Sequence, residues 1–247
     1  MASAFGTSYR FRDPGTAGRR AVVSMGANAF VLLVVAVADV VVATGDRVWV
    51  VGSAWSEGTG STSDLIAPPL RWLATLEIAI GVIAALCWLI WQAQATENQW
   101  ATGRPTEITP AWAVLWWFVP VAQMWKPAVA VRQLLRASAP VGARGDAALA
   151  ATWWTLFLAG AVLRFVGFFV LLGTAFARLE YGAAATLRAS DVAPGLWVSA
   201  AGAVVFALAA WPAIAIVRRV DARQITRGGD LVGAAGSHAP PPRPDIR

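Results

Sequence analysis

The stretch Pro110-Ala-Trp-Ala-Val-Leu-Trp-Trp-Phe-Val-Pro-Val-Ala-Gln-Met-Trp-Lys-Pro127 is almost as apolar as a membrane span, yet prolines interrupt it and arginines follow it. Pro120 and Pro127 each remove a backbone donor and clash with the preceding helical turn, which disfavours one straight helix through both. Whether this stretch crosses a bilayer decides the topology of the whole chain.

The rest of the chain has the composition of a membrane protein. Of 247 residues, 57% are hydrophobic and 14% are charged, and the mean hydropathy is +0.58. These values are too apolar for a water-soluble domain. Crossing roughly 30 Å of hydrocarbon takes a helix of about 20 residues. Four segments are long enough, namely 21–44, 70–91, 147–177 and 195–217, and residues 110–136 are a fifth candidate.

The basic residues distinguish a four-span chain from a five-span chain. With four spans, the amino terminus, the connection 92–146 and the carboxyl tail share one side and hold 15 of the 20 Lys and Arg residues. The other side holds Arg47, Arg71, Arg178 and Arg188. A fifth span would divide the basic residues other than Arg164 into 12 and 7. Because basic residues accumulate in cytoplasmic loops, the sequence predicts four spans with both termini in the cytoplasm.

The tryptophans support the same topology, because indole prefers the headgroup level of a bilayer. Four of the 14 tryptophans lie near the outer ends of the predicted helices. The ten near the inner ends or on the inner connection are Trp88, Trp91, Trp100, Trp112, Trp116, Trp117, Trp125, Trp153, Trp154 and Trp211. We therefore expect residues 110–136, the Trp/Pro element, to enter the inner leaflet without crossing it, as a re-entrant or a flat interfacial segment.

The second half of the Trp/Pro element has an amphipathic pattern. Val131, Leu134 and Leu135 fall on one helical face, while Arg132 and Arg136 share the opposite face. This pattern suits a helix that turns its arginines toward anionic headgroups; a plug packed under the helix bundle is the alternative. The candidate interfacial residues are Trp112, Trp116, Trp117, Phe118, Pro120, Trp125, Pro127, Arg132 and Arg136.

Three ionisable residues interrupt the predicted spans, namely Asp39, Glu77 and Arg164. Each is costly against lipid, so each is expected to face the bundle interior, water or a partner. Arg164 could pair with Glu77 and take Asp39 as a second acceptor. Two interpretations follow. We favour a buried ion pair that fixes the order of the helices over a polar pathway for a proton, an ion or a small solute.

Several chemistries find little support in the sequence. Cys87 and His238 are the only residues of their types, which excludes an intrachain disulfide and a cysteine metal cluster and disfavours a Ser-His-Asp or Cys-His site. No glycine-rich phosphate loop is present. The net charge of +6 follows from the cytoplasmic bias of basic residues, so nucleic acid is not an expected partner. We expect no catalytic residue, cofactor or metal. An intramembrane enzyme that uses Glu97 or Glu107 is the weakest hypothesis, because neither has a visible catalytic companion.

The chain divides into a basic cytoplasmic tail (1–20), a four-span membrane domain (21–227) and a Pro/Gly-rich cytoplasmic tail (228–247) that is expected to be disordered. Ser199, Ala203 and Ala207 form a row of small residues four apart. Such a row permits close helix contact within the bundle or between copies of the chain.

The run from Trp91 through Asn98 and Gly103 to Trp116-Trp117-Phe118-Val-Pro120-Val-Ala-Gln-Met-Trp125-Lys-Pro127, with Arg132 and Arg136 after it, resembles a bacterial multi-pass membrane family, domain of unknown function 4328 (DUF4328). Residues 216–227 resemble the closing segment of that family, so the resemblance covers residues 25–227. Gln123 stands where the family usually has Asn, and Ala128 where Tyr is common. The resemblance implies a fold and a bacterial plasma-membrane location, and it supplies no activity.

Together these observations predict an all-α bundle of four transmembrane helices with the Trp/Pro element on its cytoplasmic side. The leading hypothesis is a non-enzymatic scaffold or accessory subunit that acts through anionic lipid, a protein partner or a second copy. The alternative is a small transporter or channel component that uses Asp39, Glu77 and Arg164.

Overall fold

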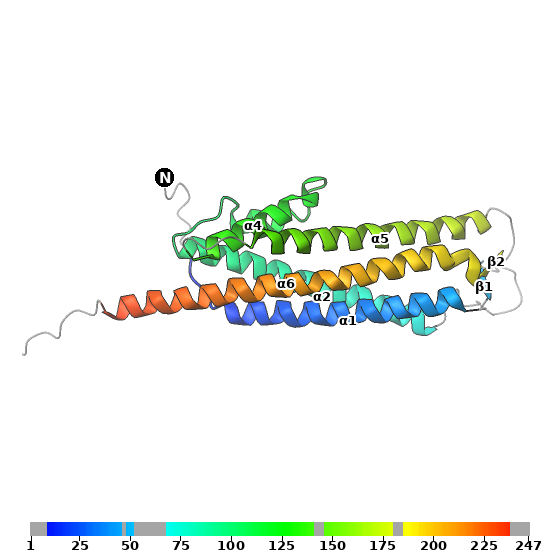
Figure 1. Ribbon diagram of the computed structural model, residues 1–247, viewed down its shortest axis with the longest axis horizontal. Helices are drawn as coiled ribbons and strands as arrows, with labels where there is room; N and C mark the ends of the chain where they lie inside the picture. The colour runs from blue at the N-terminus through cyan, green and yellow to red at the C-terminus, as the bar shows by residue number, and fades with distance from the viewer. Residues whose placement is uncertain (1–8, 46–47, 52–67, 141–145, 180–184, 238–247) are drawn as a thin grey trace, which may run out of the picture. The chain divides into compact units, whose positions relative to one another are not determined.

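The computed structural model describes residues 9–45, 48–51, 68–140, 146–179 and 185–237 (Figure 1). Most of these residues belong to four long helices: α1 (Pro14–Thr44), α2 (Pro68–Ala101), α5 (Ala147–Leu179) and α6 (Ala189–Ser237). Each contains a stretch that is long and apolar enough to cross a membrane. The helix is the conformation such stretches require, because hydrocarbon offers no partner for an unpaired backbone group. The predicted all-α fold with four candidate spans is therefore confirmed.

Two helix ends differ from the predicted limits of the tails. Helix α1 already begins at Pro14, where Asp13 Oδ1 accepts a 3.1 Å hydrogen bond from the Gly15 N–H and the proline occupies a favourable first helical position. At the other end, α6 continues to Ser237 through the start of the segment predicted to be disordered. The two glycines at 228 and 229 weaken a helix by about 1 kcal/mol each without ending it here. The remainder of that tail, residues 238–247, lies outside the described residues.

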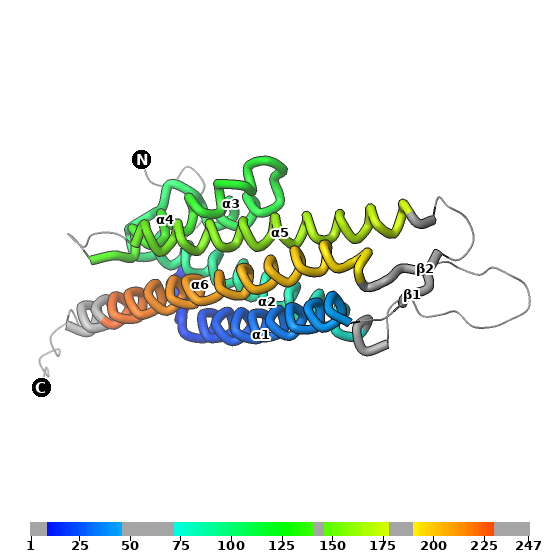
Figure 2. The backbone as a smooth tube through the Cα atoms, turned by 45° about the vertical axis from the view of Figure 1, so that its right-hand side comes forward, coloured from blue at the N-terminus to red at the C-terminus, as the bar shows by residue number. Residues whose placement is uncertain are grey.

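The Trp/Pro element consists of short helices, as its prolines predict. Helix α3 (Pro110–Leu115) begins after Thr109, whose side chain caps it, and ends before Pro120. A short 3₁₀ turn, η1 (Ala122–Met124), precedes α4 (Lys126–Ser138), which carries Pro127 in its first turn. Figure 2 shows the chain doubling back between α3 and α4. The reversal requires Val121 at φ 65°, a value unfavourable for a β-branched residue.

The sequence analysis did not predict two short strands. β1 (Val48–Val51) pairs antiparallel with β2 (Ala185–Arg188), with Val48 opposite Arg188. The segment Val-Trp-Val-Val has high strand propensity, but a two-stranded ribbon depends on its surroundings for stability.

The described residues divide into two compact units. The apolar unit comprises residues 21–45, 48–51, 68–87, 148–179 and 185–214, and the amide-rich unit comprises residues 9–20, 88–140, 146–147 and 215–237. All four long helices contribute to both units.

In the apolar unit, small side chains let helices approach one another closely. Leu32 and Ala36 of α1 pack against Ala200, Ala203 and Ala207 of α6, two of which belong to the row of small residues noted in the sequence. On another side of α6, a Cβ at Gly202 would lie 2.7 Å from the backbone nitrogen of Arg164, closer than any side chain permits. The packing of α5 against α6 therefore depends on the absence of a side chain at Gly202.

The amide-rich unit has a different kind of core. Besides Trp91, Val131 and Leu134, its buried side chains include many polar ones. These are Gln92, Thr96, Asn98, Gln99, Thr106, Ser138, Asp221 and Gln224. Buried polar groups are costly unless they are hydrogen-bonded, so their partners determine how this unit is held together.

Candidate functional site

Arg164 on α5 joins two carboxylates in the apolar unit. Its Nη2 pairs with Oε1 of Glu77 on α2, and its Nη1 lies 3.9 Å from Oδ2 of Asp39 on α1. Nη1 also donates a 2.9 Å hydrogen bond to Oγ of Ser199 on α6. The structure thus brings the three predicted charges together and adds Ser199, which the sequence analysis treated only as a small residue.

The geometry of this charge cluster bears on both of its interpretations. Each of the four long helices contributes one side chain, so the cluster can fix the order of the helices around Arg164. One guanidinium faces two carboxylates, which leaves a formal charge of −1. Asp39 Oδ2 has no hydrogen-bond partner among the described residues. The carboxylate of Asp39 is therefore less well compensated than that of Glu77.

The Trp/Pro element exposes large apolar side chains at its tip. Phe118 is 67% exposed and Val121 is 69% exposed. The other large apolar residues exposed between α3 and the start of α4 are Trp112, Leu115, Met124 and Trp125. Such a concentration on one short segment is typical of a surface that contacts lipid or a partner.

The remaining candidate interfacial residues differ in how far they are buried in the protein. Trp116 and Trp117 are half-buried, Pro120 is exposed and Pro127 is buried. Lys126 Nζ lies 5.0 Å from the ring centroid of Trp116, within cation–π range. The set therefore contains an exposed tip and a base packed into the protein.

Helix α4 has the amphipathic arrangement that its sequence predicts. Val131, Leu134 and Leu135 are buried, while Arg132 and Arg136 are exposed. The apolar face thus packs inside the amide-rich unit, and the two arginines remain available to an external anion.

Hydrogen bonds fasten the Trp/Pro element to neighbouring segments of the same unit. The Trp117 indole N–H donates to Oε1 of buried Gln92 on α2 at 3.0 Å. Gln133 of α4 accepts a 3.2 Å hydrogen bond from the Ile108 N–H and donates a 2.6 Å bond to Glu107. Glu107 is one of the two carboxylates of the enzyme hypothesis. It thus accepts a hydrogen bond from Gln133, the side chain that also holds the loop of Glu107 at Ile108. The other, Glu97, lies 3.8 Å from Arg12.

Asn98 on α2 joins three segments of the amide-rich unit. Its Oδ1 accepts from the Arg12 N–H at 2.9 Å, and its Nδ2 donates to the Arg12 carbonyl at 2.9 Å and to Gln224 Oε1 at 3.0 Å. Gln224 in turn donates to the Ala95 carbonyl at 2.8 Å. The amino-terminal segment, α2 and α6 therefore share one buried network of hydrogen bonds.

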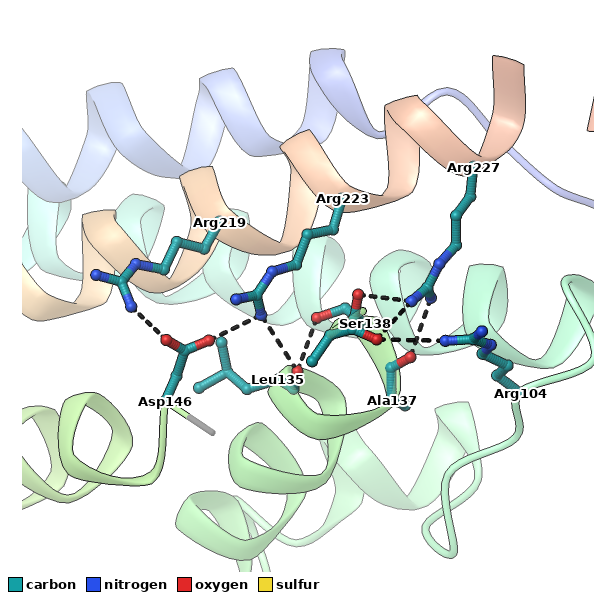
Figure 3. Close-up of polar contacts among 9 residues, drawn as sticks. Arg104, Leu135, Ala137, Ser138, Asp146, Arg219, Arg223 and Arg227 are labelled. Atoms are coloured by element: carbon teal, nitrogen blue, oxygen red, sulfur yellow. Dashed lines mark hydrogen bonds and ion pairs between the residues drawn. The ribbon is translucent and has the colours of Figure 1, made fainter. Parts of the chain in front are cut away.

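Four arginines gather at the carboxyl end of α4 (Figure 3). Arg219 and Arg223 of α6 both pair with Asp146, which precedes α5. Arg227 donates to the carbonyls of residues 137, 138 and 139 at 2.8–3.0 Å, and Arg104 donates to the carbonyl of residue 139 at 3.3 Å. We call Arg104, Arg219, Arg223 and Arg227 the arginine cluster. The guanidinium groups of Arg104, Arg223 and Arg227 satisfy carbonyls that a helix end leaves unpaired.

The sequence analysis did not identify the buried amides or the arginine cluster as a site. One signal was visible, because Arg219, Arg223 and Arg227 are four residues apart and share a helical face. Gln92, Thr96 and Gln99 likewise follow helical spacing. The sequence did not reveal their partners, which lie far away in the chain.

Comparison with known families identifies the chain at the level of the family. Residues 52–222 match the family described as domain of unknown function (DUF4328). The match is shorter at its amino-terminal end than the resemblance over residues 25–227, and α1 lies outside it. None of the curated proteins and none of the solved structures compared with the chain matches it. With more than half of its length matched and four candidate membrane spans, the chain belongs to the DUF4328 family of multi-span membrane proteins of unknown function.

Proposed function

We propose that this protein is a non-enzymatic scaffold or accessory subunit of the bacterial plasma membrane, with both termini in the cytoplasm. It acts through anionic lipid headgroups together with a protein partner or a second copy of the chain. It requires no cofactor, metal or nucleic acid. The Trp/Pro element is the part that makes these contacts.

The observation that carries this proposal is the contrast between the two ends of the Trp/Pro element. Its base is hydrogen-bonded to Gln92 and packed through Leu134 and Leu135, whereas its tip exposes Phe118 and Val121. Keeping such a tip in water costs about 25 cal/mol per Å² of apolar surface, a cost that the interfacial region of a bilayer removes. The exposed Arg132 and Arg136 supply the complementary charge for anionic headgroups.

A fluorophore at the tip tests this placement. Val121→Cys on a Cys87→Ala background, labelled with an environment-sensitive dye, is expected to report an apolar surrounding in vesicles that contain phosphatidylglycerol. Emission typical of water, equal to that of a dye at Glu107→Cys, an exposed position before the Trp/Pro element, would reject the lipid contact.

Replacing Arg132 and Arg136 together by glutamine is expected to weaken the binding of the Trp/Pro element to the anionic membrane surface by roughly 1 kcal/mol per charge. The dye at position 121 should then shift toward its emission in water, and this difference from the wild-type protein should shrink as rising salt screens the wild-type attraction. The double variant Arg10→Gln with Arg12→Gln is a matched control, because both side chains are exposed and lie outside the Trp/Pro element. An equal shift in the control would show that membrane binding of the tip depends on the net charge of the protein and not on the two arginines of α4.

The charge cluster supports a second candidate function, a transporter or channel component. The observation in its favour is the formal charge of −1 around Arg164, with Asp39 Oδ2 lacking a hydrogen-bond partner among the described residues. A proton or cation could occupy such a position. Against it stands the contribution of one side chain from each helix, which suits a fixed structural joint. We expect no proton or cation flux from the wild-type protein in reconstituted vesicles; flux that disappears in Asp39→Asn would favour this second function.

Accessibility labelling tests the proposed topology of the two ends. On the Cys87→Ala background, a cysteine at position 240 is expected to react with an impermeant thiol reagent only in inverted vesicles. A cysteine at position 56 should react in intact cells. Both positions lie outside the described residues. Labelling of position 240 from outside intact cells would reject the cytoplasmic carboxyl terminus.

A further inference from the structure

The arginine cluster holds more positive charge than its surroundings neutralise. Among the described residues, only Arg219 and Arg223 pair with a carboxylate, that of Asp146, so the four guanidinium groups and Asp146 together carry a formal charge of +3. The backbone carbonyls at the end of α4 offset part of this charge through their dipoles but carry no net charge. This excess of positive charge is complementary to an anionic ligand.

The unpaired hydrogen-bond donors of the arginine cluster also favour an anionic ligand. Arg104, Arg219 and Arg223 each bond through Nη1 alone within the described part of the chain. Their Nη2 and Nε donors therefore have no acceptor there. Buried Gln99, whose Oε1 accepts from Arg227, also has an Nε2 without an acceptor among the described residues. Among the described residues, donors thus exceed acceptors around the arginine cluster.

The donors that lack acceptors are accessible. The side chain of Arg219 is 52% exposed and that of Arg223 is 24% exposed, and Arg104 lies on the surface. Arg227 is different, because its two terminal nitrogens are occupied by Gln99 and the carbonyls of α4. Arg227 therefore fixes the end of α4. Arg219 and Arg223 converge at Asp146 and can reach one external ligand, whereas Arg104 lies at the opposite end of the cluster. The planar guanidinium fork matches the oxygens of a phosphate group.

We propose that the arginine cluster binds the phosphate of one anionic phospholipid headgroup, with Arg219 and Arg223 as its ligands, because both already reach one carboxylate, that of Asp146. Asp146 directly precedes the candidate span that begins at Ala147, and Arg219 follows buried Ile216 and Val217 at the end of an apolar stretch. A lipid phosphate lies at this level of a bilayer, which favours a headgroup over free phosphate. The proposal rests on the membrane placement proposed above, and it adds a lipid site separate from Arg132 and Arg136.

Asp146 acts as an internal competitor for the lipid. Its two oxygens occupy Arg219 and Arg223, so removing its charge would leave both arginines to the phosphate. This competition predicts opposite effects for two kinds of substitution at the same site. Loss of arginines weakens lipid binding, and loss of the aspartate strengthens it.

The test titrates phosphatidylglycerol into phosphatidylcholine nanodiscs that contain the full-length protein and counts retained lipids by native mass spectrometry. Arg219→Gln with Arg223→Gln is expected to weaken retention of one phosphatidylglycerol by about 30-fold, since both arginines lie at the headgroup level. Asp146→Asn is expected to strengthen it. Arg10→Gln with Arg12→Gln removes the same charge at two exposed positions outside both proposed lipid contacts and should leave this one lipid in place.

Three results would overturn the proposal: unchanged retention in Arg219→Gln with Arg223→Gln, an equal loss in the Arg10 and Arg12 control, or weaker retention in Asp146→Asn. Displacement of the lipid by millimolar inorganic phosphate would assign the site to free phosphate instead. The dye at position 121 reports separately on the Trp/Pro element. If the proposed function is wrong, the dye at position 121 will report water around the tip, whether or not the arginine cluster retains a lipid.

Discussion

Replacing Arg164 by leucine is expected to lower the free energy of unfolding by roughly 3–5 kcal/mol, the cost of leaving a buried charge without its partner. Arg164 compensates Glu77 directly, approaches Asp39 and bonds Ser199, so the substitution removes one contact to each of three other helices. Unfolding in mixed micelles, followed by circular dichroism, measures the effect. Arg132→Leu is the control, because it removes an exposed arginine from α4.

A second substitution separates the two interpretations of the charge cluster. If Arg164 mainly neutralises Glu77, then Arg164→Leu with Glu77→Gln should recover much of the lost stability, and Asp39→Asn should recover more. Equal destabilisation of the single and double variants would contradict this pairing. A solute pathway requires the charges themselves, so it predicts a stable but inactive multiple variant in a flux assay.

Asn98→Leu is expected to destabilise the amide-rich unit by roughly 3 kcal/mol, because it leaves several buried groups without partners at about 1–3 kcal/mol each. Those groups are the Arg12 N–H, the Arg12 carbonyl and Gln224 Oε1. Hydrogen exchange of the backbone amides in residues 88–101 and 215–227 measures the local loss of protection. The amino-terminal segment should lose protection with them, because Asn98 is its buried attachment.

Gln94→Leu provides a matched control for Asn98→Leu. Gln94 lies on the same helix and bonds the same amino-terminal segment, but through a single exposed hydrogen bond to the Asp13 carbonyl. Its loss should cost less than about 1 kcal/mol. If the two variants lose equal protection, the buried network does not hold the unit together.

The sequence predicts features that depend on local chemistry. Charges are rare in apolar spans, so Asp39, Glu77 and Arg164 were conspicuous, and the spacing of Val131, Leu134 and Leu135 defined the buried face of α4. Prolines at 120 and 127 indicated that the Trp/Pro element is broken into short helices.

Features that depend on distant partners were not predictable. From the sequence, Asn98 lies in a connection outside the membrane and would be expected to be solvated. Its burial depends on Arg12, 86 residues away, and on Gln224, 126 residues away. From the sequence, the arginines on α6 look like an ordinary basic helical face. Backbone carbonyls are present at every residue, so the sequence does not show which of them accept hydrogen bonds from arginine. The pairing of β1 with β2 likewise depends on context more than on propensity.

The central claim is that the chain crosses the membrane four times and that α3 and α4 stay on the cytoplasmic side. Arg136→Cys on a Cys87→Ala background tests it most directly, because Arg136 is exposed on α4 and a fifth span through residues 110–136 would move it to the outside. With four spans, we expect an impermeant thiol reagent to label this cysteine in inverted vesicles and to leave it unlabelled in intact cells. Labelling in intact cells, with inverted vesicles unlabelled, would contradict the four-span topology.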